Sequence, residues 1–330
     1  MSFAWPTGFE RVLDEEWTRA DLDTLALKYD TVENHGWYRN LEPTLDQLAA
    51  HLRDGMTLID YSGGTGILLD RLLHRIPAVQ AGYLLVDSSP KFLRLALEKL
   101  GREPRVGFRL IHFLKAEKRL QLLDEVLPAP MIGRFDALAS TNAIHLYYDL
   151  DDTLRSWHRA LRSGGRAFVQ SGNIRNPDAA PGDWIIDATV EQIDAVARDL
   201  VRERPAYAAF RAGVDDAARM REYDKLREKF FLPVRPLAYY VDQFRAAGFG
   251  VVDVTTRSIQ AEVADWYQFL AAYHEGVLGW AGGSRRIDGA DPSEETVTLR
   301  LQLMRDALEV IFGGKPSFQA SWTYLTCERP

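Results

Sequence analysis

The chain has 330 residues, 46% of them hydrophobic, which suffices for one large α/β domain with additions or for two domains. Its net charge is −7 and its basic residues are scattered, which disfavours nucleic-acid binding. No apolar run approaches the roughly 20 residues of a membrane span, the acidic N-terminus is unlike a signal peptide, and the single Cys327 precludes an internal disulfide. We therefore expect a cytoplasmic protein without nucleic-acid or membrane partners, and the sequence leaves a homo-oligomer open.

Residues 1–54 are expected to form an N-terminal helical lid. Apolar residues share a helical face over 22–29 and again over 41–52, and Gly55 is placed to end the second helix. An aromatic and polar segment lies between these two helices. Its most informative side chains are Tyr29, His35, Trp37 and Tyr38.

Strands and helices alternate between residues 55 and 172. Helices are predicted at about 66–75, from Pro90 to Gly101 and at 151–162. Because the strands are short and apolar on both faces, they predict a doubly wound, mostly parallel sheet with helices on both faces. The predicted strands span 57–61, 82–87, 106–111, 135–140 and 166–171.

The pattern changes after Gly172. We expect a helical insertion at 173–235 and, within 236–330, a second insertion at about 260–316. Insertions of this kind commonly form lids or substrate walls. The remaining segments complete a seven-stranded sheet and are predicted as a helix at 236–247 and strands at 250–256 and 318–327.

The segment Asp60-Tyr-Ser-Gly-Gly-Thr-Gly66 is predicted to be a ligand-binding turn between a strand and a helix. Gly64 and Gly66 allow positive φ and a close approach of ligand to backbone, and the amides at the helix start point at what is bound. No Lys follows Gly66, which excludes a phosphate-binding NTPase loop. A dinucleotide site has support from Asp87, but Leu69 stands where its third glycine belongs.

Taken together, four landmarks resemble the class I, Rossmann-like S-adenosylmethionine-dependent methyltransferase superfamily. They lie in order within residues 55–172, and Ser62 replaces the first glycine of the family loop. The landmarks are Asp60 to Gly66, Val86-Asp-Ser-Ser-Pro90, Ser140-Thr-Asn-Ala-Ile-His145 and Ala160-Leu-Arg-Ser-Gly-Gly165.

The resemblance implies S-adenosyl-L-methionine as the cofactor. Asp60 would help to orient its ammonium group, and Asp87 would accept hydrogen bonds from its two ribose hydroxyls. The family often has an acid after the third strand, where this chain has Lys115 with Glu117 nearby. The expected cofactor-binding residues are Tyr29, Asp60, Ser62, Gly63, Gly64, Gly66, Asp87, Ser88, Asn142 and Ala143.

Methyl transfer is an in-line displacement that depends mainly on proximity, alignment and a dry pocket, so a base is needed only when the acceptor loses a proton. His145, beyond the fourth strand, is the candidate catalytic residue. We expect no metal and a small-molecule acceptor methylated at oxygen or nitrogen. An NAD(P)-dependent oxidoreductase and a non-catalytic cofactor-binding protein are the alternatives. The candidate substrate residues are His35, Trp37, Tyr38 and Tyr147.

Overall fold

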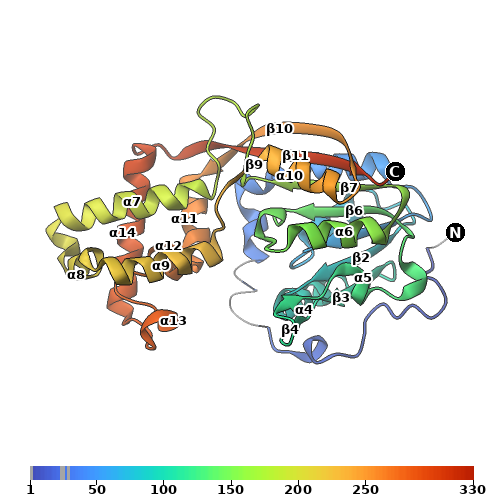
Figure 1. Ribbon diagram of the computed structural model, residues 1–330, viewed down its shortest axis with the longest axis horizontal. Coiled ribbons are helices and arrows are strands. Elements are labelled where there is room, and N and C mark those ends of the chain that lie inside the picture. The colour runs from blue at the N-terminus through green and yellow to red at the C-terminus, as the bar shows by residue number, and fades with distance from the viewer. Residues whose placement is uncertain (1–2, 23–26, 28–29) are drawn as a thin grey trace.

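A seven-stranded sheet in the order β10-β11-β7-β6-β1-β2-β3 forms the centre of the protein. The structure, a computed structural model, describes residues 3–22, 27 and 30–330. Figure 1 shows the sheet and its helices as one body, with a lobe of helices beside it. The predicted seven-stranded, mostly parallel α/β sheet is therefore confirmed.

The five strands that come first along the chain run parallel to one another, and the two strands nearest the C-terminus complete the sheet. β11 pairs antiparallel with both β7 and β10. β1 lies between β2 and β6, so the strand order reverses there and opens a crevice at the carboxyl ends of β1 and β6. The strands are β1 (Thr57–Tyr61), β2 (Gly82–Asp87), β3 (Val106–Leu110), β6 (Phe135–Thr141), β7 (Leu161–Ser171), β10 (Gly250–Glu262) and β11 (Ser317–Glu328).

Helices cover both faces of the sheet because successive strand residues point to opposite sides. Leu58 packs with the helices of one face, and Ile59 packs with those of the other. The first face carries α2 (Glu42–His51), α3 (Ile67–Arg75) and α4 (Pro90–Leu100). The second face carries α5 (Leu123–Val126), α6 (Leu150–Ala160) and α10 (Leu237–Ala246).

The two helical insertions pack on each other as a single helical lobe, seen at the left of Figure 1. Two buried tryptophans join them: Trp266 Nε1 donates to Thr189 Oγ1 at 2.9 Å, and Trp280 Nε1 donates to Asp194 Oδ1 at 2.7 Å. The lobe comprises α7 (Ala188–Glu203), α8 (Arg211–Asp215), α9 (Ala217–Phe230), α11 (Val263–Ala272), α12 (His274–Leu278), α13 (Arg285–Asp288) and α14 (Glu294–Phe312).

The expectation that residues 1–54 are helical is wrong for residues 3–15. This segment runs alongside the edge strand β3 and forms no helix. Phe108 N donates to Arg11 O at 2.7 Å, so this segment shields backbone groups of an edge strand. Phe9 packs closely over Gly107, where no side chain intervenes. Most of the helix expected at 22–29 lies outside the described residues.

Short elements complete the chain. Two small pairings are β4 (Phe113–Leu114) with β5 (Arg119–Leu120) and β8 (Ile174–Arg175) with β9 (Arg235–Pro236). None of the helices that the structure describes is long and apolar enough to cross a membrane. The 3₁₀ helices are η1 (Glu16–Arg19), η2 (Thr31–Asn34), η3 (Gly36–Leu41), η4 (Ala129–Met131), η5 (Ile144–Leu146) and η6 (Pro205–Phe210).

Candidate active site

The turn after β1 has the backbone that its residues predict. Gly64 and Gly66 have φ values of 57° and 83°, and Ser62 has a φ of 59°. A side chain on Gly66 would also meet the Leu100 Cδ1 atom at 2.9 Å, so the turn packs closely against α4. The left-handed backbone at Ser62 explains why a glycine suits this position and why serine there carries strain.

Tyr147 fastens this turn. Its hydroxyl donates to Ser62 Oγ and lies equally close, 2.9 Å, to Ser140 Oγ. Since the Tyr147 proton points to Ser62, the Ser140 hydroxyl is the donor in the second contact. The structure therefore places Tyr147 beside the glycine turn and not among the residues that we find around the acceptor cavity described below.

Asp87 lies at the end of β2, facing the turn. Gly64 N donates to its Oδ2 at 2.8 Å and Ser89 N to its Oδ1 at 2.7 Å. Burial raises the pKa of this carboxyl, and the backbone hydrogen bonds oppose the rise. Each oxygen keeps a further lone pair, so Asp87 can accept hydrogen bonds from two neighbouring hydroxyls.

Asp60 lies beneath the turn and is fully buried, and neither of its carboxylate oxygens has a hydrogen-bond partner. Burial, and secondarily the charge of Asp87, raise the pKa of Asp60 to about 8. A buried carboxyl without a partner is costly in its charged form. A ligand with vicinal hydroxyls and positive charge, as S-adenosylmethionine has, therefore fits these two acids.

A cofactor pocket of about 430 Å³ opens over the turn. Gly63, Gly66 and Asp60 lie behind its lining, and Tyr29 falls outside the described residues. Of the expected cofactor residues, the pocket is lined by Ser62, Gly64, Asp87, Ser88, Asn142 and Ala143. Lining residues that the sequence did not indicate include Tyr61, Phe92, Ile111, Phe113, Leu120 and Leu146.

The hairpin of β4 and β5 forms part of this pocket wall through Phe113 and Leu120. Glu117 lies in the turn of this hairpin, not on a helix, and forms an ion pair with Arg119. Glu117, the acid nearest to the position where the family often has one, is therefore engaged in a local contact.

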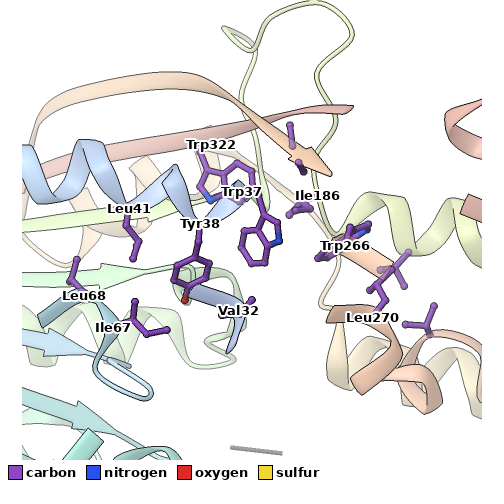
Figure 2. Close-up of a cluster of buried hydrophobic side chains, with 14 of the residues drawn as sticks. Val32, Trp37, Tyr38, Leu41, Ile67, Leu68, Ile186, Trp266, Leu270 and Trp322 are labelled. Carbon is purple, nitrogen blue, oxygen red and sulfur yellow. The ribbon is translucent and has the colours of Figure 1, made fainter. Parts of the chain in front are cut away.

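A second cavity of about 250 Å³, named the acceptor cavity after the role proposed for it below, adjoins the cofactor pocket, and the two share Phe92, Asn142 and Leu146 in their linings. Most of its wall is aromatic. Figure 2 shows Trp37 beside Trp322 on the core side and Trp266 on the lobe side. The aromatic lining residues are Trp37, Tyr38, Phe92, Phe230, Phe231, Trp266, Phe269, Tyr273 and Trp322.

Among the expected substrate residues of the N-terminal segment, Trp37 and Tyr38 line this cavity and His35 does not. Burial lowers the pKa of His35, although Asp265 opposes the shift. Gly36 N donates to Asp265 Oδ2 at 3.1 Å, which ties the segment to α11 of the lobe. His35 thus lies at the contact between this segment and the lobe.

His145 lines the cavity and is paired with an acid that the sequence did not indicate. Its Nε2 lies 3.5 Å from Asp187 Oδ2, and its Nδ1 lies 2.9 Å from Ser171 Oγ. Burial lowers the pKa of His145 to about 4 and raises that of Asp187 to about 7. In its deprotonated state, this pair can accept one proton in the wall of the cavity.

Asp187 comes from the helical lobe, at the residue that precedes α7. An acid directly before a helix is usually interpreted as a cap, but its side chain forms no cap hydrogen bond here. In the sequence, the position of Asp187 before a helix indicates only a helix start, so nothing there points to a contact with His145. Among the described residues, no cluster of three or more His, Cys, Asp or Glu side chains is arranged to hold a metal ion.

Residues 59–167 match the family model described as a methyltransferase domain. This match covers β1 to β7, the same part of the chain that carries the glycine turn, Asp87 and His145. Residues 59–167 therefore form a methyltransferase domain, in agreement with the resemblance.

One curated relative has a methyltransferase name, and two solved structures share the fold. The ubiquinone/menaquinone biosynthesis C-methyltransferase UbiE of Escherichia coli is 28% identical over 173 residues, which cover 49% of this chain and 62% of UbiE. The chain thus matches less than two thirds of the length of this relative. The YcgJ protein of Bacillus subtilis shares the fold with a TM-score of 0.51 and 12% identity, over 88% of this chain and 98% of YcgJ. A solved structure from Bacillus halodurans shares the fold with a TM-score of 0.50 and 14% identity, over 87% of this chain and 98% of that chain.

Proposed function

We propose that this protein transfers a methyl group from S-adenosylmethionine to a small-molecule acceptor, at oxygen or nitrogen. The observation that carries the proposal is an aromatic cavity that shares Asn142 and Leu146 with the cofactor pocket and has His145 in its wall. An acceptor in this cavity would lie next to the group that donates the methyl.

The turn and the two acids would hold the cofactor. Asp87 would accept from the ribose hydroxyls, while the negative charge of Asp60 would favour the positively charged end. When bound, S-adenosylmethionine supplies a methyl group on a positively charged sulfur, and the sulfur leaves as a neutral thioether.

The protein's own contribution is orientation, exclusion of water and movement of one proton. Aromatic side chains from the core and the lobe enclose the acceptor, which holds it in line and removes competing water. The deprotonated pair of His145 and Asp187 would take the proton that a hydroxyl or amine loses as it is methylated.

Two observations weigh against the alternatives that the sequence left open. The methyltransferase family model spans the glycine turn, which disfavours the oxidoreductase. The cavity beside the cofactor pocket is open and not filled by side chains, which disfavours a non-catalytic binding protein. UbiE is named a carbon methyltransferase, so identification of the methylated atom belongs to the test.

Isothermal titration calorimetry should show micromolar binding of S-adenosylmethionine and S-adenosylhomocysteine. Incubation with methyl-labelled cofactor and a panel of small hydroxyl, amine and carbon acceptors should give a labelled product, in which NMR locates the methyl group. Tight binding of NADPH without a response to either adenosyl ligand would sink the proposal.

A further inference from the structure

The acceptor cavity contains buried polar atoms that nothing in the protein satisfies. The indole Nε1 of Trp37 has no hydrogen-bond partner, although this side chain is only 6% exposed. Asn173 is 1% exposed, and both its amide nitrogen and its amide oxygen lack a partner. Buried polar groups in folded proteins are usually paired, and these three unpaired atoms belong to residues that line one cavity, where a bound ligand would pair with them.

The charge of the cavity narrows the kind of ligand. Among the described residues that line it, none is Lys or Arg, and the ionisable side chains are His145, Asp187 and two tyrosines. A phosphate or carboxylate on the ligand would find no cation in this wall and would be repelled by Asp187.

The aromatic side chains restrict the shape of the ligand. Trp37 and Trp322 are stacked, with ring centroids 6.1 Å apart and planes 20° apart. Trp266 and Phe269 are stacked across 5.1 Å with planes 12° apart, on the lobe side. Flat side chains in parallel pairs offer flat surfaces, which suit a planar aromatic ring.

We infer that the cavity binds an uncharged, planar aromatic molecule with two neighbouring oxygen groups. One is a hydroxyl that faces His145 and Asp187 and receives the methyl, and the other oxygen pairs with the Trp37 and Asn173 side chains. This inference rests on the proposed methyl transfer and specifies its substrate class. The hydroxyl oxygen forms the new bond to the methyl carbon, the sulfur–carbon bond of the cofactor breaks, and the hydroxyl proton goes to the His145–Asp187 pair.

An ammonium acceptor fits these atoms less well. Asp187 and the aromatic faces would attract a cation. However, an ammonium group can only donate hydrogen bonds, so the N–H groups of Trp37 and Asn173 would remain unpaired. An oxygen accepts from both, and a hydroxyl can in addition donate to the amide oxygen of Asn173. The unsatisfied donors therefore favour oxygen over nitrogen.

The first experiment compares three ligands of similar size by calorimetry in saturating S-adenosylhomocysteine. They are 2′-hydroxyacetophenone, benzylamine and benzoate. We expect 2′-hydroxyacetophenone to bind at least about tenfold more tightly than either of the others and, with S-adenosylmethionine, to be methylated on its hydroxyl oxygen. If S-adenosylhomocysteine itself does not bind, the proposed function fails. If it binds but the amine or the acid is preferred, or none of the three binds, the inference on substrate class is overturned.

Variants then test the assigned atoms. Trp37→Phe keeps the ring but removes the N–H, and Asn173→Ala removes the amide. Each should raise the KM for 2′-hydroxyacetophenone about tenfold and leave S-adenosylhomocysteine binding within twofold, because neither residue lines the cofactor pocket. Unchanged KM values in both variants would overturn the assignment.

Asn176 provides the matched control for Asn173. It is similarly buried, but its amide nitrogen donates to Thr256 Oγ1 at 2.7 Å and to Thr323 Oγ1 at 3.1 Å. Its amide oxygen accepts from Asp178 N at 3.0 Å. Asn176→Ala should therefore lower the Tm without raising the KM, whereas Asn173→Ala should raise the KM with little loss in Tm. The opposite pattern would show that Asn173 is structural.

Discussion

The cofactor pocket and the acceptor cavity share a boundary but are built in different ways. The cofactor pocket is lined by residues between Tyr61 and Thr153, mostly in loops that follow the strands of the sheet. The acceptor cavity draws on the N-terminal segment, the core, the lobe and the last strand, from Trp37 to Trp322. The first presents the Asp87 carboxylate and the backbone of the turn beside apolar side chains, while aromatic faces make up most of the second.

This difference separates two tasks. The pocket presents backbone amides and carboxylates to a ligand of fixed chemistry, so its residues are confined to a short part of the chain. The cavity is completed by the lobe, whose α9 and α11 contribute Phe230, Trp266 and Phe269. A change in the lobe could therefore alter the acceptor without altering the cofactor.

Asp87→Ala should break the cofactor side completely. The variant loses the acceptor for two hydroxyls and the partner of Gly64 N and Ser89 N. Hydrogen bonds to a charged group contribute about 1.5–3 kcal/mol each, so the loss of two should lower affinity for S-adenosylmethionine by about 100-fold or more. Calorimetry measures the loss, with circular dichroism to verify folding. A loss below tenfold would show that Asp87 does not bind the ribose.

Asp60→Asn should show what the buried acid costs the ligand-free protein. The folded pKa of Asp60, about 8, lies above the value of 3.8 for an unfolded chain. Between these values, the folded state holds a proton that the unfolded state has lost, so stability falls as the pH rises. Over pH 5 to 7, the wild type should lose about 3 kcal/mol relative to Asp60→Asn.

Urea unfolding at several pH values tests this expectation, with the exposed Asp253→Asn as the control. Above pH 8, where the Asp60 carboxyl is ionised, the same Asp60→Asn variant should bind S-adenosylmethionine about tenfold more weakly, because it lacks the negative charge. Parallel stability curves for the wild type and Asp60→Asn would refute the assigned pKa shift.

On the acceptor side, Asp187→Asn should lower kcat about 100-fold and leave S-adenosylhomocysteine affinity within twofold. The deprotonated pair accepts the proton, so kcat/KM in the wild type should rise with pH and level off above about 7, the pKa of Asp187. Other ionisable groups also surround Asp187. Tyr240 faces it, and a small cavity that Asp187 lines is also lined by Glu191, Arg227 and Glu228.

The variant should lose this rise, and His145→Ala should lower kcat to a similar extent. Substrate-dependent initial rates between pH 5.5 and 9 provide the measurement. A pH profile unchanged in Asp187→Asn would remove the pair from the proposed mechanism and leave both residues as packing side chains.

The sheet and the turn could be predicted because their determinants are local. Apolar runs bounded by turn residues indicated β1, β2 and β6, and Asp60 to Gly66 indicated a ligand turn whose backbone angles the structure shows. The cofactor residues follow strands, where a parallel sheet gathers them at one edge. Their binding roles remain predictions, and Tyr29 lies outside the described residues.

The acceptor cavity could not be predicted because its determinants are tertiary. The sequence around Asp187 indicates only a helix start, and nothing local shows that the lobe brings this residue to His145. Phe269 and Trp322 have the spacing of ordinary core residues, and only packing between lobe and core turns them toward one cavity. The hairpin at Glu117 was missed because its strands have two residues each.

The smallest effects are expected at Ser62, where the turn departs from the family pattern. Ser62→Ala keeps the strained φ and loses the hydrogen bond from Tyr147, so unfolding free energy should fall by about 1 kcal/mol. Ser62→Gly loses the same bond but relieves the strain, so it should lie within about 1 kcal/mol of the wild type.

Tyr147→Phe should cost about 1–2 kcal/mol, because it also leaves the buried Ser140 hydroxyl without its partner. Exposed Tyr148→Phe is the matched control and should have no effect. In a double-mutant cycle by urea unfolding, Ser62→Ala and Tyr147→Phe should couple by about 1 kcal/mol, since each removes the same hydrogen bond. Additive effects would mean that Tyr147 does not hold the turn. The backbone strain at Ser62 would then have no stabilising hydrogen bond to offset it. Coupling would instead show that this chain replaces a glycine's freedom with a hydroxyl contact from the loop that carries His145.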